Sequence, residues 1–242
     1  MKRLDDLENG YRIWQDSEAF CFGIDAVLLA HYPVMKDGDC VMDLCTGNGV
    51  IPLIMHGTAR DEAKRVSFRG LEIQEGAASL ARESVNLNGL SDDIGIITGD
   101  VKEAANLFGA ASFSLVTCNP PYTPGGGGLR GEDDRKTIAR HEVLCTLSDV
   151  VEAASKLLKM KGRLAMIHRP SRLAEIFACM RMHGLEPKRM RMVYPFADKA
   201  PNLVLLEAVK GGGPQLNVDP PLIVYEKSGE YTREVLQIYG KI

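Results

Sequence analysis

The stretch Val41-Met42-Asp43-Leu44-Cys45-Thr46-Gly47-Asn48-Gly49-Val50 decides the fold. An apolar run of strand length leads into two glycines, and a helical pattern follows them. This order is typical of the place where a doubly wound parallel sheet binds a nucleotide-like ligand. A tight turn that binds nothing remains the alternative interpretation of the two glycines.

On both sides of this stretch, short apolar runs alternate with longer helical patterns, as a parallel sheet with crossover helices requires. Strands are predicted over residues 40–44, 67–73, 95–98, 113–118 and 163–168. Helices are predicted over 49–56, 74–88, 102–107, 148–158 and 171–182, and three of them should end at Gly89, Gly162 and Gly184. The runs 190–194 and 203–209 leave no room for a crossover helix, so they predict an antiparallel hairpin at the sheet edge. The prediction is a doubly wound, mixed α/β sheet of seven strands.

The chain divides into three predicted parts. Residues 1–38 form an N-terminal flap, with a hairpin of 11–14 and 19–22 and a helix over 25–31. Residues 39–210 form the catalytic domain. Residues 211–242 form a tail with a glycine hinge, an extended segment over 220–225 and a helix over 232–239.

Composition limits the class of protein. No apolar run reaches the roughly 18 residues of a membrane helix, and the start lacks a signal sequence, so we expect a cytoplasmic protein without membrane contact. The six cysteines are scattered without metal-ligand spacing, which predicts free thiols and no metal. The net charge of −3 gives no overall attraction to nucleic acid, so we expect no DNA partner, and RNA binding needs a local basic face. The oligomeric state stays open.

Three acidic residues lie at the C-terminal ends of three successive predicted strands. Asp43 precedes the glycine turn and suits a cationic ammonium better than a diphosphate, because like charges repel. Glu72 could accept hydrogen bonds from both ribose hydroxyls, and Asp100 from the amine of adenine. Gly47 and Gly49 let the protein backbone pass close to the ligand, and together with the three acids they predict S-adenosylmethionine rather than NAD as the cofactor.

Two of these acids have alternative interpretations. Glu72 could be a surface residue that caps the helix starting near Gln74. Asp100 could be a helix N-cap, which is compatible with contact to adenine.

Asn119-Pro120-Pro121-Tyr122 follows the fourth predicted strand and suits the binding of an amine. The lone pair of an aromatic or amide amine is delocalised, so methyl transfer requires acceptors that hold its two hydrogens. The Asn119 side-chain oxygen and the Pro120 carbonyl can supply them, because the prolines fix the backbone in advance. Tyr122 offers a face for stacking a planar group. A double-proline turn that merely ends a strand is the alternative.

The order of DLCTGNG, GLEIQ, GD and NPPY resembles the Rossmann-like class I amino-methyltransferases. Further segments resemble the tRNA(Val) adenine-N6 methyltransferase family in its Gram-positive branch. They are residues 22–29, 117–122, 139–142, 168–170, 221–225 and 230–232. The similarity covers nearly the whole chain. It implies methylation of adenine 37 in the anticodon loop of a valine tRNA, with the base flipped out to reach Tyr122.

The resemblance also implies residue roles. It assigns cofactor binding to Asp25, Asp43, Gly47, Gly49, Glu72, Asp100 and Asn119, and catalysis to Asn119, Pro120 and Tyr122. Asp25 would close the pocket over the cofactor, with a helix N-cap as its alternative role. RNA contacts are expected from positive groups near the strand ends, with solvated surface charges as the alternative: Arg130, Arg135, Lys136, Arg140, His168, Arg169 and Arg172. Residues 125–128, four glycines in a row, depart from the family pattern.

Three other functions stay open. A protein methyltransferase acting on the N5 atom of glutamine needs the same clamp, although such enzymes usually carry a helical N-terminal domain that 38 residues cannot supply. A ribosomal RNA methyltransferase would attack guanine N2. A non-catalytic RNA-binding module would have no need of an amine clamp.

Overall fold

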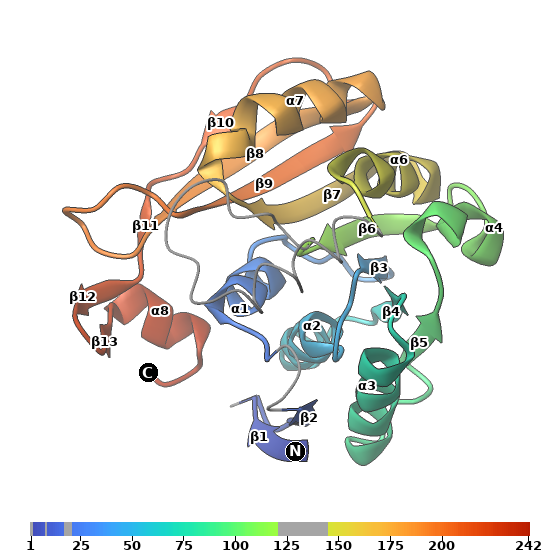
Figure 1. Cartoon of the computed structure of the whole chain (residues 1–242), viewed down its shortest axis with the longest axis horizontal. Coiled ribbons are helices and arrows are strands. Elements are labelled where there is room, and N and C mark those ends of the chain that lie inside the picture. Colours follow the sequence, from blue (N-terminus) through green and yellow to red (C-terminus); the bar gives the residue numbers. More distant parts are fainter. Residues whose placement is uncertain (1, 8, 17–20, 121–144) are drawn as a thin grey trace, which may run out of the picture.

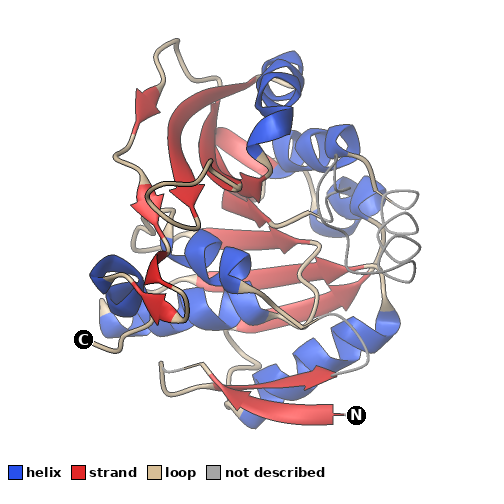
Figure 2. Cartoon of the chain, turned by 60° about the vertical axis from the view of Figure 1, so that its left-hand side comes forward, coloured by secondary structure: helices blue, strands red, loops and turns tan. Residues whose placement is uncertain are grey.

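A mixed β-sheet forms the centre of the computed structural model, which describes residues 2–7, 9–16, 21–120 and 145–242. Its main strands are β3 (Cys40–Leu44), β4 (Ser67–Glu72), β5 (Ile94–Thr98), β6 (Phe113–Cys118), β7 (Leu158–His168), β8 (Leu185–Tyr194) and β9 (Leu203–Lys210). They lie side by side in the order β8-β9-β7-β6-β3-β4-β5. Figure 2 shows this sheet between two layers of helices.

The strand directions confirm the predicted doubly wound sheet. β3 pairs in parallel with β4 on one side and β6 on the other. β9 runs antiparallel between β7 and β8, as expected for the edge hairpin. The predicted number of seven strands is too low within the described residues, because two short tail strands, β10 (Asn217–Val218) and β11 (Leu222–Ile223), add to β8 and make nine.

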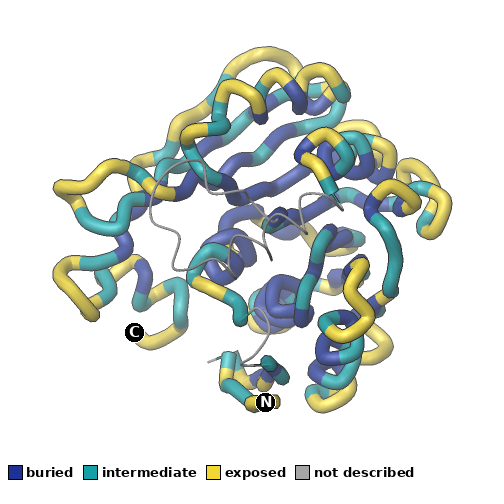
Figure 3. Tube along the Cα trace, in the orientation of Figure 1, coloured by how far each residue is buried: buried dark blue, intermediate teal, exposed yellow. Residues whose placement is uncertain are grey.

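The helices cover both faces of the sheet because its strands are apolar on both sides. One layer holds α1 (Ile24–His31), α2 (Val50–Asp61) and α3 (Glu75–Leu87), and the other holds α4 (Ala104–Phe108), α6 (Leu147–Leu157) and α7 (Leu173–Met182). The 3-10 turns η1 (Val101–Glu103) and η2 (Pro170–Arg172) precede α4 and α7. Val41 packs toward the first layer and Met42 toward the second, and Figure 3 shows the buried strands between exposed helix surfaces. Among the described helices, none has the length and apolar character needed to cross a bilayer.

Two of the three expected glycine stops are confirmed, and one is wrong. Gly89 and Gly184 follow α3 and α7 with φ of 70° and 74°, in the left-handed region that ends helices. Gly162 instead lies inside β7, since α6 ends at Leu157. A Cβ atom on Gly162 would stand 2.8 Å from the Lys159 carbonyl oxygen. A glycine here therefore allows the close backbone approach that accompanies the register shift between β6 and β7.

The N-terminal ribbon differs from the predicted hairpin. β1 (Lys2–Asp6) pairs antiparallel with β2 (Arg12–Asp16), whereas the prediction pairs residues 11–14 with 19–22. The strand predicted over residues 11–14 is present as β2, but its partner is β1, which precedes it in the sequence. Asn9-Gly10 makes the connection, with Gly10 at φ 85°, and an Asn-Gly pair is a strong hairpin signal. Residues 17–20 lie outside the described residues.

The tail ends in a small aromatic unit. β12 (Tyr225–Lys227) pairs with β13 (Glu230–Tyr231), and α8 (Arg233–Ile238) begins at Thr232, whose side chain accepts a hydrogen bond from Val235 N. The rings of Tyr225 and Tyr231 stack at 5.2 Å between centroids, and those of Tyr231 and Tyr239 at 5.4 Å. The expected helix near 232–239 is thereby confirmed. In Figure 1 α8 lies beside α1, which it contacts.

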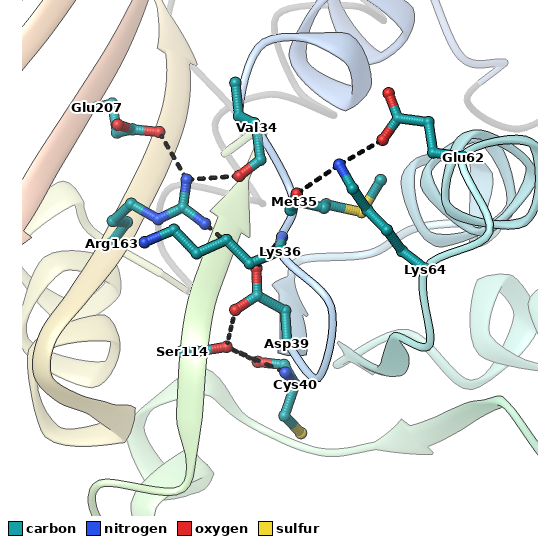
Figure 4. A network of polar contacts seen from close by, with 10 residues as sticks. All are labelled: Val34, Met35, Lys36, Asp39, Cys40, Glu62, Lys64, Ser114, Arg163 and Glu207. Carbon is teal, nitrogen blue, oxygen red and sulfur yellow. Dashed lines mark hydrogen bonds and ion pairs between the residues drawn. The ribbon is translucent and has the colours of Figure 1, made fainter.

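A buried polar network fastens the segment between α1 and β3 to the sheet (Figure 4). Asp39 accepts hydrogen bonds from Ser114 Oγ at 2.7 Å, Lys36 N at 2.8 Å and Arg163 Nη2 at 3.2 Å. The Arg163 guanidinium also donates to the Val34 carbonyl at 2.7 Å. Side-chain exposures of 13% for Arg163 and 7% for Asp39 make this a buried ion pair, and Arg163 has a second carboxylate partner in Glu207 at 3.5 Å. The loss of Arg163 would therefore leave two buried carboxylates without their cation, which is costly.

We expect Asp39→Ala to lower the free energy of unfolding by about 2 kcal/mol, because Lys36 N and Ser114 Oγ lose their best acceptor while Arg163 keeps Glu207 and the Val34 carbonyl. Urea denaturation measures this loss. The matched control is Asp37→Ala, which removes an ion pair with Arg65 whose side chains are 52% and 88% exposed. That control should cost at most about 1 kcal/mol. Equal losses in both variants would contradict the structural role of the buried network.

Candidate active site

The glycine turn after β3 has the backbone that the two glycines predict. Cys45, Gly47 and Gly49 have φ of 58°, 57° and 82°, all in the left-handed region. Gly49 is the N-cap of α2, and a Cβ atom there would lie 3.1 Å from the Ala81 Cβ. Glycine at this position therefore allows α2 to start close to α3, and the turn opens at the carboxyl edge of the sheet.

Glu72 stands beside this turn at the end of β4. Its side chain is buried, with 6% exposure, so it is not the surface residue considered as an alternative. One carboxylate oxygen accepts from Gly47 N and the other from Gln74 N, both at 2.9 Å. Because an ionised carboxylate offers about four lone-pair sites, both oxygens keep acceptor capacity for a ligand.

Glu72 and Asp100 share a small hollow at this edge of the sheet. The hollow is lined by Cys45, Leu71, Glu72, Ile73, Gly99, Asp100, Val101 and Cys145. Asp100 is the N-cap of η1, and its side chain accepts from Lys102 N at 2.9 Å, which confirms the capping role. Carboxylates at the rim and apolar side chains between them match a ligand with a hydroxylated part and a flat apolar part.

Asp43 lies deeper, at 1% exposure, near the end of β3. One of its oxygens accepts from Thr117 Oγ1 at 2.6 Å, across the β3–β6 pair. The other oxygen has no hydrogen-bond partner within the described part of the chain, and neither has Thr46 Oγ1 in the turn. Burial raises the pKa of Asp43 to about 7, and the negative charge of Glu72 adds to the rise.

Asn119 directly follows β6 at the same edge. Its Nδ2 donates to Asp25 Oδ2 at 3.2 Å. Its Oδ1 is buried and lacks a partner among the described residues. Pro120 is buried next to it. Asp25 lies in the first turn of α1, whose N-cap is Gly23, so the N-cap role considered for Asp25 is wrong.

Several predicted residues lie elsewhere or cannot be placed. Tyr122, Arg130, Arg135, Lys136, Arg140 and the glycine run 125–128 fall outside the described residues. Arg169 donates to the Asn202 carbonyl at 3.1 Å, and Arg172 pairs with Glu175. Both arginines follow β7, whose end carries the buried His168. Burial and the nearby Arg172 lower the pKa of His168 to about 4, so its imidazole is neutral at pH 7. The prediction of His168 as a positive group that contacts RNA is therefore wrong, because the side chain is buried and uncharged.

The structure adds residues that the sequence did not suggest. Thr117 fixes one oxygen of Asp43, and its signal was that it is one of two polar residues, with Ser114, in a mostly apolar strand. Ile73 keeps 39% of its surface exposed in the hollow although it is large and apolar. Cys145 lines the hollow together with Cys45, although the two residues are 100 positions apart, and no local sequence pattern indicates that they meet.

The residues present fit S-adenosylmethionine. The Asp43 oxygen that lacks a close partner among the described residues is a buried acceptor suited to an ammonium, and the buried carboxylate of Glu72 is held by two backbone N–H groups. An orphaned buried acceptor costs about 1 to 3 kcal/mol, which a bound donor would recover.

The raised pKa of Asp43 predicts how stability depends on pH in the ligand-free protein. Between pH 3.8, the ordinary value, and about 7, the folded state holds a proton that the unfolded chain has lost, so stability falls as pH rises through this window. We expect Asp43→Asn to remove this slope and to be the more stable protein at pH 8. At about 1.4 kcal/mol for each pKa unit, the difference is on the order of 4 kcal/mol.

Urea titrations between pH 4 and pH 8 measure this difference. Asp61→Asn, at a side chain 61% exposed, is the control and should keep the wild-type slope. An unchanged slope in Asp43→Asn would contradict the assignment to Asp43.

Comparisons with known proteins agree with this geometry. The sequence profile of the methyltransferase small domain family matches residues 11–180. A protein of Porphyromonas gingivalis named tRNA1(Val) (adenine(37)-N6)-methyltransferase is 30% identical over 237 residues, covering 94% of this chain and 90% of its own length. A protein of the same name from Tolumonas auensis is 26% identical over 228 residues, covering 94% and 92%.

The fold has a solved counterpart as well. A protein of Agrobacterium tumefaciens described as a predicted O-methyltransferase superposes with a TM-score of 0.71 over 90% of this chain and 96% of its own, at 22% identity. This likeness supports the fold alone. Together with the family profile and the relatives, it leads to the conclusion that this chain belongs to the methyltransferase small domain family and is an S-adenosylmethionine-dependent methyltransferase.

Proposed function

We propose that this enzyme methylates the N6 atom of adenine 37 in tRNA(Val). The relatives that carry this activity in their names align with 94% of the chain, including the tail beyond the family profile. Within the family we place the chain in the Gram-positive branch, on the sequence resemblance described above. The observation that carries the proposal is the buried Oδ1 of Asn119 at the carboxyl end of β6, which has no hydrogen-bond partner among the residues that the structure describes.

The chemistry needs two acceptors at one point. S-adenosylmethionine supplies an electrophilic methyl group when bound. The amine of adenine is planar because its lone pair is delocalised, and hydrogen bonds to Asn119 Oδ1 and the Pro120 carbonyl would favour its tetrahedral form. No strong general base is needed before the transfer, because the N–H proton becomes acidic once the nitrogen is quaternised. Positioning, whose effects reach about 7 to 11 kcal/mol, can therefore carry most of the catalysis. We assign the stacking of the base to Tyr122.

The cofactor residues have separate tasks in this proposal. Asp43 would accept from the methionine ammonium, Glu72 from the ribose hydroxyls and Asp100 from the adenine amine of the cofactor. Gly47 and Gly49 allow the backbone to approach the ligand. The three acids belong to β3, β4 and the segment after β5, three neighbouring strands that end at the same edge of the sheet.

The RNA contacts are assigned to positive side chains around this edge. Arg169 and Arg172 follow β7 directly, and Arg130, Arg135, Lys136 and Arg140 follow Asn119 in the sequence. Phosphate contacts from such groups would make binding weaken as salt rises. A tRNA substrate is consistent with the cytoplasmic location that we propose. We also propose the division into a flap over 1–38, a catalytic domain over 39–210 and a tail over 211–242.

The purified chain should convert adenine 37 of a tRNA(Val) transcript to N6-methyladenosine, identified by mass spectrometry of the nucleosides. Asn119→Ala should lower kcat by at least about 100-fold, as the loss of one oriented hydrogen-bond partner does elsewhere. Cofactor affinity measured by calorimetry should stay within a few-fold. A transcript with guanine at position 37 is the control and should remain unmodified at that nucleotide.

A second incubation, with methyl-labelled cofactor and either total RNA or a protein release factor, separates the rival substrates. Methyl label in a release factor but not in RNA would support glutamine methylation, and N2-methylguanosine would support the guanine activity. Full activity of Asn119→Ala would remove the proposed amine site.

A further inference from the structure

We propose that Asp25 is a positioning residue that fixes which end of the Asn119 amide faces the substrate. This inference rests on the proposed function, since it concerns how the amine acceptor is oriented. It differs from the role that the sequence resemblance implied, in which Asp25 closes the pocket over the cofactor.

The contact between the two side chains joins distant parts of the chain. Asn119 Nδ2 lies 3.2 Å from Asp25 Oδ2, across 94 residues of sequence. The other oxygen of Asp25 accepts from Ala26 N at 3.0 Å, within the first turn of α1. The opposite end of the amide, Asn119 Oδ1, is the buried atom that has no partner in the described part of the chain. The donor end of the Asn119 amide is therefore held by Asp25, and the acceptor end is available to accept a hydrogen bond from a substrate amine.

The chemistry of the pair gives the amide a direction. An ionised carboxylate only accepts hydrogen bonds, whereas an amide has a donor end and an acceptor end. Asp25 can bind only the donor end, so the acceptor end must point away from it. If the amide turned over, its oxygen would face a carboxylate and its N–H groups would face the N–H groups of the substrate amine. Asp25 thus excludes the orientation that cannot bind an amine.

The carboxylate of Asp25 stands on a rigid support. Residues 26–30 of α1 are each at most 3% exposed, and α1 packs against α2, β7 and α8. The chain before α1 is held by Gln15, whose side-chain oxygen accepts from Phe22 N at 3.2 Å. A Cβ atom on Gly23 would lie 2.7 Å from Asp25 Oδ1, so a glycine here leaves room for the carboxylate. Such support is what an oriented hydrogen bond requires.

A reciprocal exchange of the two side chains tests the direct contact. Asp25→Asn should lower kcat moderately, because the new amide can present either end. Asn119→Asp should lower it more, because two carboxylates then face each other. In the double variant, the amide introduced at position 25 would donate to the carboxylate introduced at position 119, whose second oxygen would accept from the amine. We expect kcat to recover by about 10-fold or more over Asn119→Asp, a coupling that only interacting residues show.

Cofactor affinity distinguishes this role from the alternative one. Calorimetry with S-adenosylmethionine should give dissociation constants within a few-fold of each other for wild type and Asp25→Asn. A large loss of affinity in Asp25→Asn, together with no recovery in the double variant, would overturn the proposal in favour of contact with the cofactor.

A third measurement does not need an active enzyme. In protein labelled with ¹⁵N asparagine, the Asn119 side-chain signal is identified by its loss in Asn119→Ala. Its exchange with water should be slow in wild type and faster in Asp25→Ala, whose folding is checked by thermal unfolding. Equal exchange rates would refute the contact, even if tRNA(Val) proves to be the wrong substrate. A wild type that leaves tRNA(Val) unmodified but shows slow exchange would sink the proposed function alone.

Discussion

The register between β3 and β6 determines what meets at the carboxyl edge of the sheet. Asp43 lies opposite Thr117 in this pairing, and both side chains belong to the face covered by α1, α2 and α3. A slip of one residue would turn each of them to the opposite face, among the apolar side chains packed under α6. Asn119 comes two residues after Thr117, so the same register sets its place relative to Asp43. The pairing of two short strands, apolar on both faces, thereby holds Asp43 and Asn119 close together.

The site keeps polar atoms in a state that stability alone would not favour. Asp43 Oδ2, Thr46 Oγ1 and Asn119 Oδ1 are buried and unpartnered among the described residues, and all three lie where β3 and β6 end. Each such atom destabilises the folded chain by about 1 to 3 kcal/mol. The same burial raises the pKa of Asp43. A ligand that donates to these atoms offsets the cost, so binding affinity and the instability of the free site have one physical origin.

Sequence patterns predicted the parts of the fold that depend on neighbouring residues. The bounds of β3 and β6 match the prediction to the residue, because a glycine turn and a double proline end these apolar runs. Contacts across long separations left no such pattern, and Asp25 with Asn119 is the clearest case. The tail strands β10 and β11 have two residues each, too few for a period to emerge. At the N-terminus, Asn9-Gly10 was a local signal, and it decided the partner of β2.

Both ends of the chain bear on the amine site through α1. The N-terminal ribbon reaches the residue before Gly23 through Gln15, and α8 packs against α1 from the other end of the chain. Leu222 and Val235 of the tail belong to the same buried cluster as Leu29 of α1. These tail residues lie beyond the 11–180 segment that the family profile covers. Because Asp25 is carried by α1, any loosening of this packing would reach Asn119 through the orientation of one carboxylate, without a direct contact between the tail and the substrate amine.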